Sequence, residues 1–148
     1  MEAVVFVGLP GSGKSSFYKG RFFQTHVRIS LDLLRTRHRE QRIMEVCLAT
    51  DQRFVIDNTN PTRAERAGYI QSAKAKRFTV VGYYFRSKVE DCLLRNAGRA
   101  GMDRVPDVAI LATAKKLEIP TVDEGFDQLL YVRIENGDFV VEEWRDEV

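Results

Sequence analysis

The sequence predicts an α/β fold in three layers: a mostly parallel, five-stranded sheet with helices on both faces and a C-terminal hairpin. Short runs of β-branched and aromatic residues alternate with helix-like stretches along the 148-residue chain, which is typical of parallel βαβ units. A glycine-rich stretch follows the first of these runs and leads into the first helix-like stretch. No repeat or linker interrupts the pattern, so we expect a single domain over residues 1–148.

In the first half of the chain, apolar runs predict strands over residues 3–7, 27–30 and 54–56. The helix that follows the glycine-rich stretch is predicted over residues 14–23. The next is predicted over residues 31–49, because apolar side chains recur at helical spacing while arginines line another face. The apolar positions are Leu31, Leu34, Ile43, Cys47 and Leu48, and the basic ones are Arg35, Arg39 and Arg42.

In the second half, Pro61 stands where the first residue of a helix belongs, with Asn60 as its N-cap, and the helix continues over residues 62–75. The pair Asn136-Gly137 predicts a tight hairpin turn. Trp144 is expected to anchor that hairpin. The remaining strands are predicted over residues 78–85 and 129–134, and the remaining helices over residues 89–97 and 106–117.

The net charge of +2 conceals a strong asymmetry along the chain. Residues 1–116 carry 21 Lys and Arg against 11 Asp and Glu, whereas residues 117–148 carry 2 against 10. Sixteen of the 23 basic residues are Arg, the side chain that pairs with two phosphate oxygens at once. We therefore expect a polyanionic partner rather than a neutral one.

Several features bear on where the protein works. The sequence contains no apolar run near the twenty or so residues of a membrane span, so no membrane partner is expected. Met1-Glu2-Ala3 leads directly into the first predicted strand, without a signal peptide. Cys47 and Cys92 are interpreted as reduced residues of the core. Together these features predict a cytoplasmic protein.

Residues 8–15, GLPGSGKS, match the phosphate-binding pattern G-x-x-x-x-G-K-[ST] between a strand and a helix. The N–H groups of this P-loop and the helix N-terminus are expected to cradle the phosphates of ATP. Lys14 is expected to reach the β- and γ-phosphates, and Ser15 to ligate Mg²⁺. Ser16 is also predicted to bind the nucleotide, although it is equally explained as a residue of the first helical turn. The predicted nucleotide-binding residues of the loop are Gly11, Ser12, Gly13, Lys14, Ser15 and Ser16.

Two aspartates follow predicted strands, at the sheet edge where ligands of such folds bind. Asp32 follows the second strand and is expected to act as general base toward an acceptor hydroxyl. Arg35, one helical turn later and on the same helix face, is expected to bind an anionic group of the acceptor. Asp57 ends the third strand and is predicted to hold Mg²⁺ through water. A purely structural role for Asp32, as the N-cap of a helix from Leu33, stays open.

Residues 95–105, RNAGRAGMDRV, are rich in arginine and glycine. The glycines predict mobility, and the four-residue spacing of Arg95 and Arg99 places two side chains on one helix face. The segment is therefore predicted to be a mobile lid whose two arginines close over the triphosphate. Arg99 and Lys14 are the predicted catalytic cations, because they would offset charge in the transition state. A solvated basic loop is the alternative.

At these residues the chain resembles the kinase domain of the 5′-polynucleotide kinase family. The resemblance covers nearly the whole chain, and its motifs are GLPGSGKSS, the Asp32–Arg35 pair, VIDNTNPTRAERAGYI, the spacing of Arg95 and Arg99, and IPTVDEGF. It implies transfer of the γ-phosphate of ATP to 5′-OH ends of DNA or RNA with Mg²⁺. Asp32 is then the general base, Arg35 contacts the 3′-phosphate of the terminal nucleotide, and Arg95 and Arg99 hold the donor phosphates.

The sequence departs from that family in two respects. Ser30-Leu31 stands where the family has Asn-Arg before the base. The D-x-D-G-[ST] phosphatase signature is absent from the sequence. Any 3′-end healing is therefore expected from a separate phosphatase or ligase. Because the helix between Asp32 and Phe54 is short, the wall of the acceptor site is expected to be open or to be formed by a second subunit of a homo-oligomer.

We predict an ATP-dependent polynucleotide 5′-hydroxyl kinase, with two alternatives. A P-loop kinase of a small metabolite or nucleotide sugar would explain the P-loop and Asp32 equally well, but it gives Arg35 no role. A nucleotide-binding module without catalysis would need neither Asp32 nor the two lid arginines.

Overall fold

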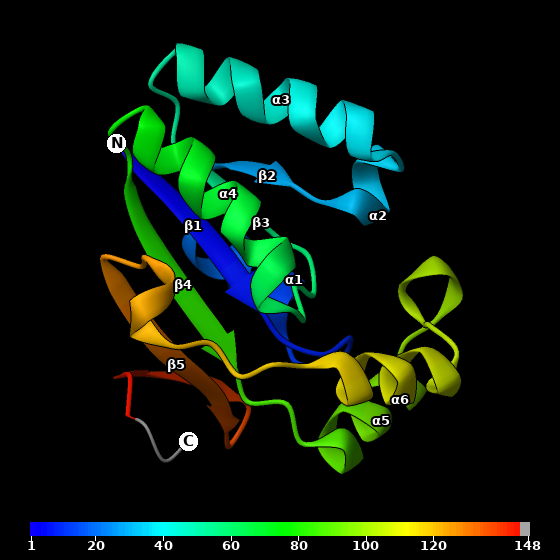
Figure 1. Cartoon of the computed structure of the whole chain (residues 1–148). Coiled ribbons are helices and arrows are strands. Elements are labelled where there is room, and N and C mark those ends of the chain that lie inside the picture. The colour runs from blue at the N-terminus through cyan, green and yellow to red at the C-terminus, as the bar shows by residue number, and fades with distance from the viewer. Residues whose placement is uncertain (146–148) are drawn as a thin grey trace.

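The computed structural model describes residues 1–145, apart from the side chain of Met102, and shows a sheet with the strand order β2-β3-β1-β4-β5-β6 (Figure 1). Strands β1 to β5 are parallel, and β6 pairs antiparallel with β5. The predicted parallel five-stranded sheet with a C-terminal hairpin is thus confirmed. The strands are β1 (Glu2–Val7), β2 (Val27–Ile29), β3 (Phe54–Ile56), β4 (Thr79–Phe85), β5 (Gln128–Glu135) and β6 (Asp138–Glu143).

Helices cover both faces of the sheet. They are α1 (Lys14–Arg21), α2 (Leu31–Leu34), α3 (Arg37–Ala49), α4 (Arg63–Ala75), α5 (Val89–Ala97) and α6 (Asp107–Lys116), with 3₁₀ turns η1 (Gly101–Asp103) and η2 (Val122–Glu124). Successive side chains of a strand point to opposite faces. In β1, Val5 therefore packs with side chains of α3 and α4, whereas Val4 and Phe6 pack with those of α1. In Figure 1, α4 lies in front of the sheet and α1 behind it.

The predicted helix over residues 31–49 is wrong in one respect, because the structure divides it into α2 and α3. Arg35 ends α2 with a φ of 73°, in the left-handed region that no helix interior accepts. Thr36 then caps α3, since its hydroxyl accepts a hydrogen bond from the Arg39 N–H at 3.1 Å. Ser30 holds the N-cap position of α2 and Asp32 lies within its first turn. Asp32 is therefore not an N-cap.

The start of α4 also differs from the prediction. Thr62, not Asn60, is the N-cap, and its hydroxyl accepts from the Glu65 N–H at 3.2 Å. Pro61 consequently lies outside the helix. Asn60 has a φ of 45°, and its amide donates to the Phe6 carbonyl at 2.7 Å. This residue ties the exit of β3 to the end of β1 instead of capping a helix.

The C-terminal hairpin forms where the sequence predicts it. Asn136 and Gly137 have φ values of 53° and 81°, the left-handed pair that a type I′ turn requires. Trp144 packs edge-on against Tyr84, with 5.7 Å between ring centroids, and is partly buried against the core. The predicted anchoring role of Trp144 is confirmed.

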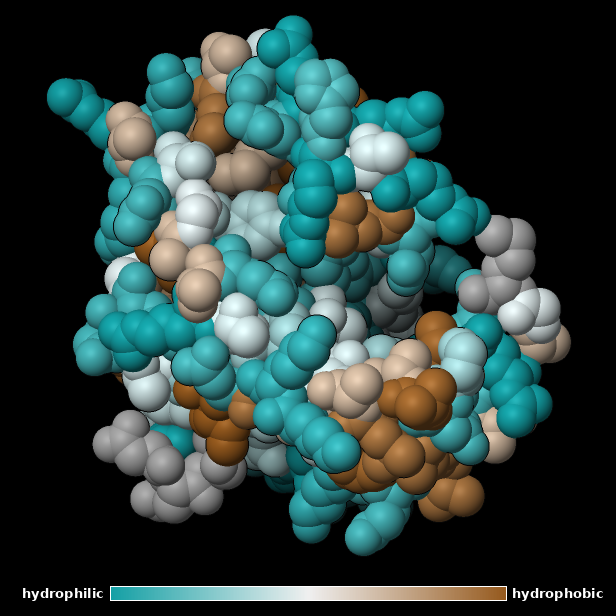
Figure 2. Space-filling view, turned by 45° about the vertical axis from the view of Figure 1, so that its right-hand side comes forward, coloured by the Kyte–Doolittle hydropathy of each residue, from teal (hydrophilic) through white to brown (hydrophobic). Residues whose placement is uncertain are grey.

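Helices α5 and α6 pack on each other around Cys92 and Ile110, apart from the two main cores. Cys92 and Cys47 are buried and free, as predicted. Figure 2 shows apolar surface gathered over this helix pair, where Leu94, Val108 and Leu111 are exposed. Among the residues that the structure describes, no helix has the length and apolar character needed to cross a membrane.

Candidate active site

The P-loop joins β1 to α1 at the carboxyl edge of the sheet. Gly11 and Gly13 have φ values of 82° and 99°, which favour glycine. A Cβ atom at Gly11 would also lie 2.6 Å from the Cys92 carbonyl oxygen, so a side chain there would displace the backbone of α5. Gly13 directly precedes α1, whose free N–H groups therefore begin at the loop. Ser12 is buried, whereas Ser16 is exposed on the first turn of α1.

Lys14 is buried and turns back across the loop. Its ammonium group donates to the carbonyls of Gly8 and Leu9, at 2.9 and 2.8 Å, and lies 3.4 Å from the Ser12 hydroxyl. The pKa of Lys14 is lowered from 10.5 to about 8, mainly by burial, and the charge of Arg99 contributes to the lowering. The charges of Asp57 and Asp32 oppose this shift. The Lys14 ammonium is therefore poised to gain from a nearby phosphate.

Nucleotide binding to this loop should take up a proton. A triphosphate beside Lys14 favours the charged form and raises its pKa above the value of about 8 in the free protein. The affinity for ATP is then highest below pH 8, where Lys14 is charged in the free protein. Above pH 8 it falls about tenfold per pH unit, until the pH reaches the pKa of Lys14 in the ATP complex. Calorimetry at pH 8 in buffers of different ionisation enthalpy should show uptake of about half a proton. Lys14→Met should abolish the uptake, and an equal uptake in that variant would contradict the assignment.

The predicted metal-binding pair lies together between α1 and the end of β3. The Ser15 hydroxyl donates to Asp57 Oδ2 at 3.2 Å. Mg²⁺ in kinases is commonly held by one or two carboxylates together with phosphates and water, and the described residues contain no cluster of three or more His, Cys, Asp or Glu side chains. A hydroxyl and a single carboxylate facing the P-loop fit an ion of that kind when ATP supplies the remaining oxygens.

Arg28 binds both Asp57 and Ser15, a role that was not predicted from the sequence. Its Nε donates to Asp57 Oδ2 at 2.8 Å, and its Nη2 to Ser15 Oγ at 3.2 Å. The Asp57 side chain is 2% exposed, so the guanidinium supplies the positive charge that a buried carboxylate needs. The available signal was a single arginine within the short predicted strand over residues 27–30, where a partly buried charged side chain requires a partner.

Removing Arg28 should make Mg²⁺ easier to bind. The guanidinium competes with the ion for Asp57, and a partly buried charge-assisted hydrogen bond contributes about 1.5–3 kcal/mol. We expect Arg28→Ala to lower the Mg²⁺ concentration at half-maximal ATP binding about tenfold, with Arg28→Lys lying between Arg28→Ala and the wild type. The measurement is ATP titration at fixed Mg²⁺ concentrations. A higher Mg²⁺ requirement in Arg28→Ala would show that Arg28 assists the metal rather than competing with it.

Asp32, the predicted general base, is exposed in the first turn of α2. This short helix is fastened by Asn58, a residue that follows Asp57 and was not identified from the sequence. Asn58 Oδ1 accepts from the Leu31 N–H at 2.9 Å, and its Nδ2 donates to Glu40 at 2.8 Å. The backbone beside Asp32 is therefore held from the exit of β3, while the carboxylate itself stays accessible.

Arg35 is exposed near Asp32, but not on the same helix face as predicted. It is the C-cap residue of α2 and leaves the helix with its left-handed φ. The helical spacing argument for the Asp32–Arg35 pair is therefore wrong, although both side chains are exposed at the corner between β2 and α3.

The predicted lid is partly helical. Arg95 lies in the last turn of α5, and its Nη1 donates to the Gly11 carbonyl at 3.2 Å, which brings it to the P-loop. Arg99 follows the end of the helix at Gly98, so the two arginines do not share a continuous helix face. Arg99 Nη1 lies 3.3 Å from the Asp103 carbonyl. The charge of Arg99 is one of the causes that lower the pKa of Lys14.

The two ends of this segment are joined by Asn96, which is fully buried. Its amide donates to the Val105 carbonyl at 2.6 Å, and its Oδ1 accepts from the Val105 N–H at 3.0 Å. Asn96 also donates to Asp107 at 3.3 Å. Asn96 and Val105 are thus fixed together, and only residues 97–104 lie between them. The mobility of this lid stays a prediction.

The fold and this loop define a P-loop kinase-type domain. The chain belongs to the family described as AAA domain, which it matches over residues 4–120. It is 30% identical over 129 residues to a bifunctional polynucleotide phosphatase/kinase of Schizosaccharomyces pombe. It is 29% identical over 135 residues to a putative bifunctional polynucleotide phosphatase/kinase of Acanthamoeba polyphaga mimivirus. These matches cover 84% and 86% of this chain, but 32% of each relative.

Solved structures with the same fold are more distant in sequence. Kti12 of Chaetomium thermophilum, solved with ADP-AlF3, has a TM-score of 0.62 at 17% identity and matches 88% of both chains. A sugar kinase of Janibacter has a TM-score of 0.68 at 18% identity, over 88% of this chain and 85% of that one. The family match and the two phosphatase/kinase relatives confirm the resemblance to the 5′-polynucleotide kinase family, and the chain is a P-loop kinase related to polynucleotide kinase domains.

Proposed function

We propose that this domain transfers the γ-phosphate of ATP to the 5′-hydroxyl end of DNA or RNA. One observation carries the proposal: the P-loop with its buried Lys14, the Ser15–Asp57 pair and the exposed Asp32 all follow the carboxyl ends of the neighbouring parallel strands β1, β3 and β2. A phosphate-binding lysine, a candidate metal pair and a candidate general base thus lie along one edge of the sheet. The similarity to two polynucleotide phosphatase/kinases supports a nucleic acid end as the acceptor.

The proposed reaction is a direct in-line transfer. The acceptor oxygen forms a bond to the γ-phosphorus while the bond from that phosphorus to the β,γ-bridging oxygen breaks, and ADP leaves. Asp32 accepts the proton of the hydroxyl. Lys14, Arg95 and Arg99 offset the charge on the transferring group. Mg²⁺, held by Ser15 directly and by Asp57 through water, would neutralise the phosphate oxygens when bound.

The acceptor would approach across the corner between β2 and α3. Arg35 and Arg39 are both exposed there, which suits a phosphodiester backbone or a terminal 3′-phosphate. In this proposal Arg35 contacts the phosphate that follows the terminal nucleotide. We further propose a cytoplasmic protein that works with a separate end-healing phosphatase or ligase, or as a homo-oligomer.

The test is phosphate transfer from γ-labelled ATP with Mg²⁺ to 5′-OH oligonucleotides, with DNA and RNA in parallel. Small hydroxyl acceptors, including sugars and nucleosides, are assayed beside them. Label on the oligonucleotides at rates well above those for the small acceptors is the expected result. Label on the small acceptors alone, or ATP binding without any transfer, would overturn the proposal in favour of a metabolite kinase or a non-catalytic module.

A further inference from the structure

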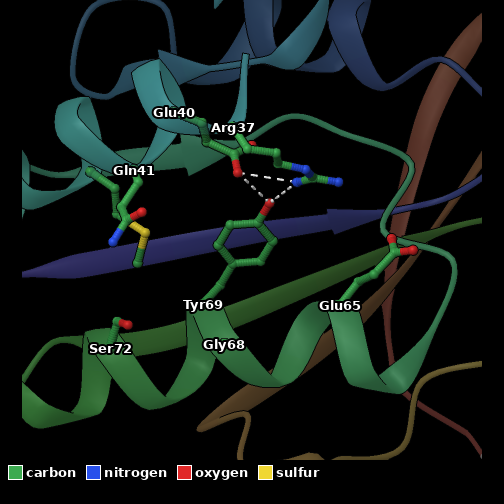
Figure 3. A pocket seen from close by; sticks show the side chains of 8 residues that line it. Arg37, Glu40, Gln41, Glu65, Gly68, Tyr69 and Ser72 are labelled. Atoms are coloured by element: carbon green, nitrogen blue, oxygen red, sulfur yellow. Dashed lines mark hydrogen bonds and ion pairs between the residues drawn. The ribbon is translucent and has the colours of Figure 1, made fainter.

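A cavity of about 290 Å³ opens between α3 and α4, outside the phosphate site (Figure 3). Arg37, Glu40 and Gln41 line it from α3, and Glu65, Gly68 and Tyr69 from α4. Its volume is near the lower end of the range for small-molecule sites, about 300 Å³. The space therefore suits one planar ring system rather than a whole nucleotide.

The back of the cavity is a fixed aromatic ring. The Tyr69 hydroxyl donates to Glu40 Oε1 at 2.9 Å and accepts from Arg37 Nη1 at 2.8 Å. Burial and the Glu40 carboxylate raise the pKa of Tyr69 to about 12, so the phenol keeps its proton. In Figure 3 the ring stands between the two helices, with the hydroxyl pointing toward Glu40 and Arg37. Tyr69 is thus held as a rigid platform.

The same hydrogen-bond network leads to the general base of the proposed reaction. Glu40 Oε2 accepts from the Asn58 amide at 2.8 Å, and Asn58 Oδ1 accepts from the Leu31 N–H at 2.9 Å. Leu31 immediately precedes Asp32. The cavity wall and the acceptor side are therefore joined through two side chains, Glu40 and Asn58.

Gly68 lines the floor of the cavity, and neither packing nor backbone conformation requires a glycine at this position. It lies in the interior of α4, where glycine destabilises a helix by about 1 kcal/mol relative to alanine. A Cβ atom at Gly68 would meet nothing within 4 Å, and its φ is not in the left-handed region. By contrast, a Cβ at Gly82 would lie 2.7 Å from the Phe126 ring. Packing thus explains Gly82 but not Gly68.

We propose that this cavity is a subsite for one nucleobase of the acceptor strand, stacked on the Tyr69 ring. Every base offers a flat face, and stacking on an aromatic side chain contributes about 1–3 kcal/mol per base. Among the described residues, the side chains of Gln41 and Ser72 make no hydrogen bond, and both face the cavity in Figure 3, where they can meet the edge of a base. Two carboxylates, Glu40 and Glu65, against the one guanidinium of Arg37 disfavour a phosphate here.

This inference rests on the proposed function, and the experiment separates the two. The wild-type protein is assayed on 5′-OH oligonucleotides in which each of the first six nucleotides is replaced in turn by an abasic one. We expect one position at which loss of the base raises KM about tenfold while kcat changes little. The sensitive position should lie further along the strand than the nucleotide that carries the 5′-hydroxyl. The reason is that Asn58 and Glu40 lie between the cavity and Asp32, the proposed base for that hydroxyl.

Variants at Gly68 test whether that position uses the cavity. Gly68→Leu fills the space, and it should raise KM for the intact oligonucleotide about tenfold and abolish the sensitivity to the abasic nucleotide. Gly68→Ala is the matched control and should behave as wild type. If oligonucleotides are phosphorylated but no abasic position matters, or Gly68→Leu leaves KM unchanged, the subsite is refuted. If no oligonucleotide is phosphorylated, the proposed function falls, and the subsite with it. The abasic series needs no variant, so its result does not depend on the folding of Gly68→Leu.

Discussion

Asp32→Asn is expected to lower kcat for phosphate transfer about 10²–10⁴-fold, the usual contribution of general base catalysis. Asparagine keeps the size and the exposure of the side chain, but its amide cannot accept the proton of the attacking hydroxyl. Asp32 lies within the first turn of α2 and caps no helix, so the substitution should leave the free energy of unfolding nearly unchanged. ATP affinity near pH 7 should also stay within a few-fold, because the predicted phosphate-binding residues belong to the P-loop and not to α2.

A matched control for this substitution is Asp51→Asn. Asp51 is exposed beyond the other end of α3, with a φ of 54° that asparagine also tolerates. We expect wild-type kcat for this variant. Asp32→Asn has a second readout, because the Asp32 charge raises the pKa of Lys14. The pH at which nucleotide binding begins to take up a proton should therefore fall in Asp32→Asn. A kcat within threefold of wild type would remove Asp32 from the mechanism.

The features that were predicted correctly are those with a local sequence signal. The P-loop needs glycines at fixed spacing, so its residues and its place between β1 and α1 follow from the pattern. The hairpin follows from Asn136-Gly137, because few other pairs adopt the left-handed conformation at two successive positions. Strand boundaries follow from apolar runs that end at polar residues such as Asp57.

The break between α2 and α3 had a signal that apolar periodicity concealed. No apolar residue occurs between Leu34 and Ile43, so the pattern was uninformative where the helix ends. Thr36 was the residue that could have indicated the start of α3, because threonine is a typical N-cap whose hydroxyl accepts from a free N–H group of the first turn. The spacing of Arg35 after Asp32 was therefore interpreted on a helix that does not continue through it.

The roles of Arg28, Asn58 and Glu40 could not be predicted from local patterns. Each depends on a contact between elements far apart in sequence: Arg28 pairs with Asp57, and Asn58 joins α2 to α3. Such contacts require the strand order, which places β2 beside β3. Only Arg28, a charged residue within a predicted strand, signals in advance that some acidic partner exists, without saying which.

The largest expected loss of stability comes from Arg66. Its side chain is fully buried in α4 and binds Glu124 of η2 through two hydrogen bonds, of 2.8 and 3.0 Å. A third, of 3.0 Å, goes to the Asn60 carbonyl. Arg66→Met would leave the Glu124 carboxylate, itself 3% exposed, buried without its cation. We expect a loss of about 3–5 kcal/mol in the free energy of unfolding, measured by urea denaturation. The same substitution at Arg63, whose exposed partner is Asp123, should cost less than about 1 kcal/mol.

The double variant Arg66→Met/Glu124→Leu separates the two consequences of losing the arginine. Removing both charges should restore most of the lost stability, because no unpaired charge stays buried. It should not restore nucleotide binding, because Arg66 also holds the Asn60 carbonyl. The Asn60 amide in turn donates to the Phe6 carbonyl. The carbonyl of the adjoining Thr59 accepts from the N–H of Gly8, which is the first residue of the P-loop. We therefore expect weaker ATP binding in a protein of nearly normal stability. Full recovery of both properties would show that the ion pair stabilises the fold without positioning the loop.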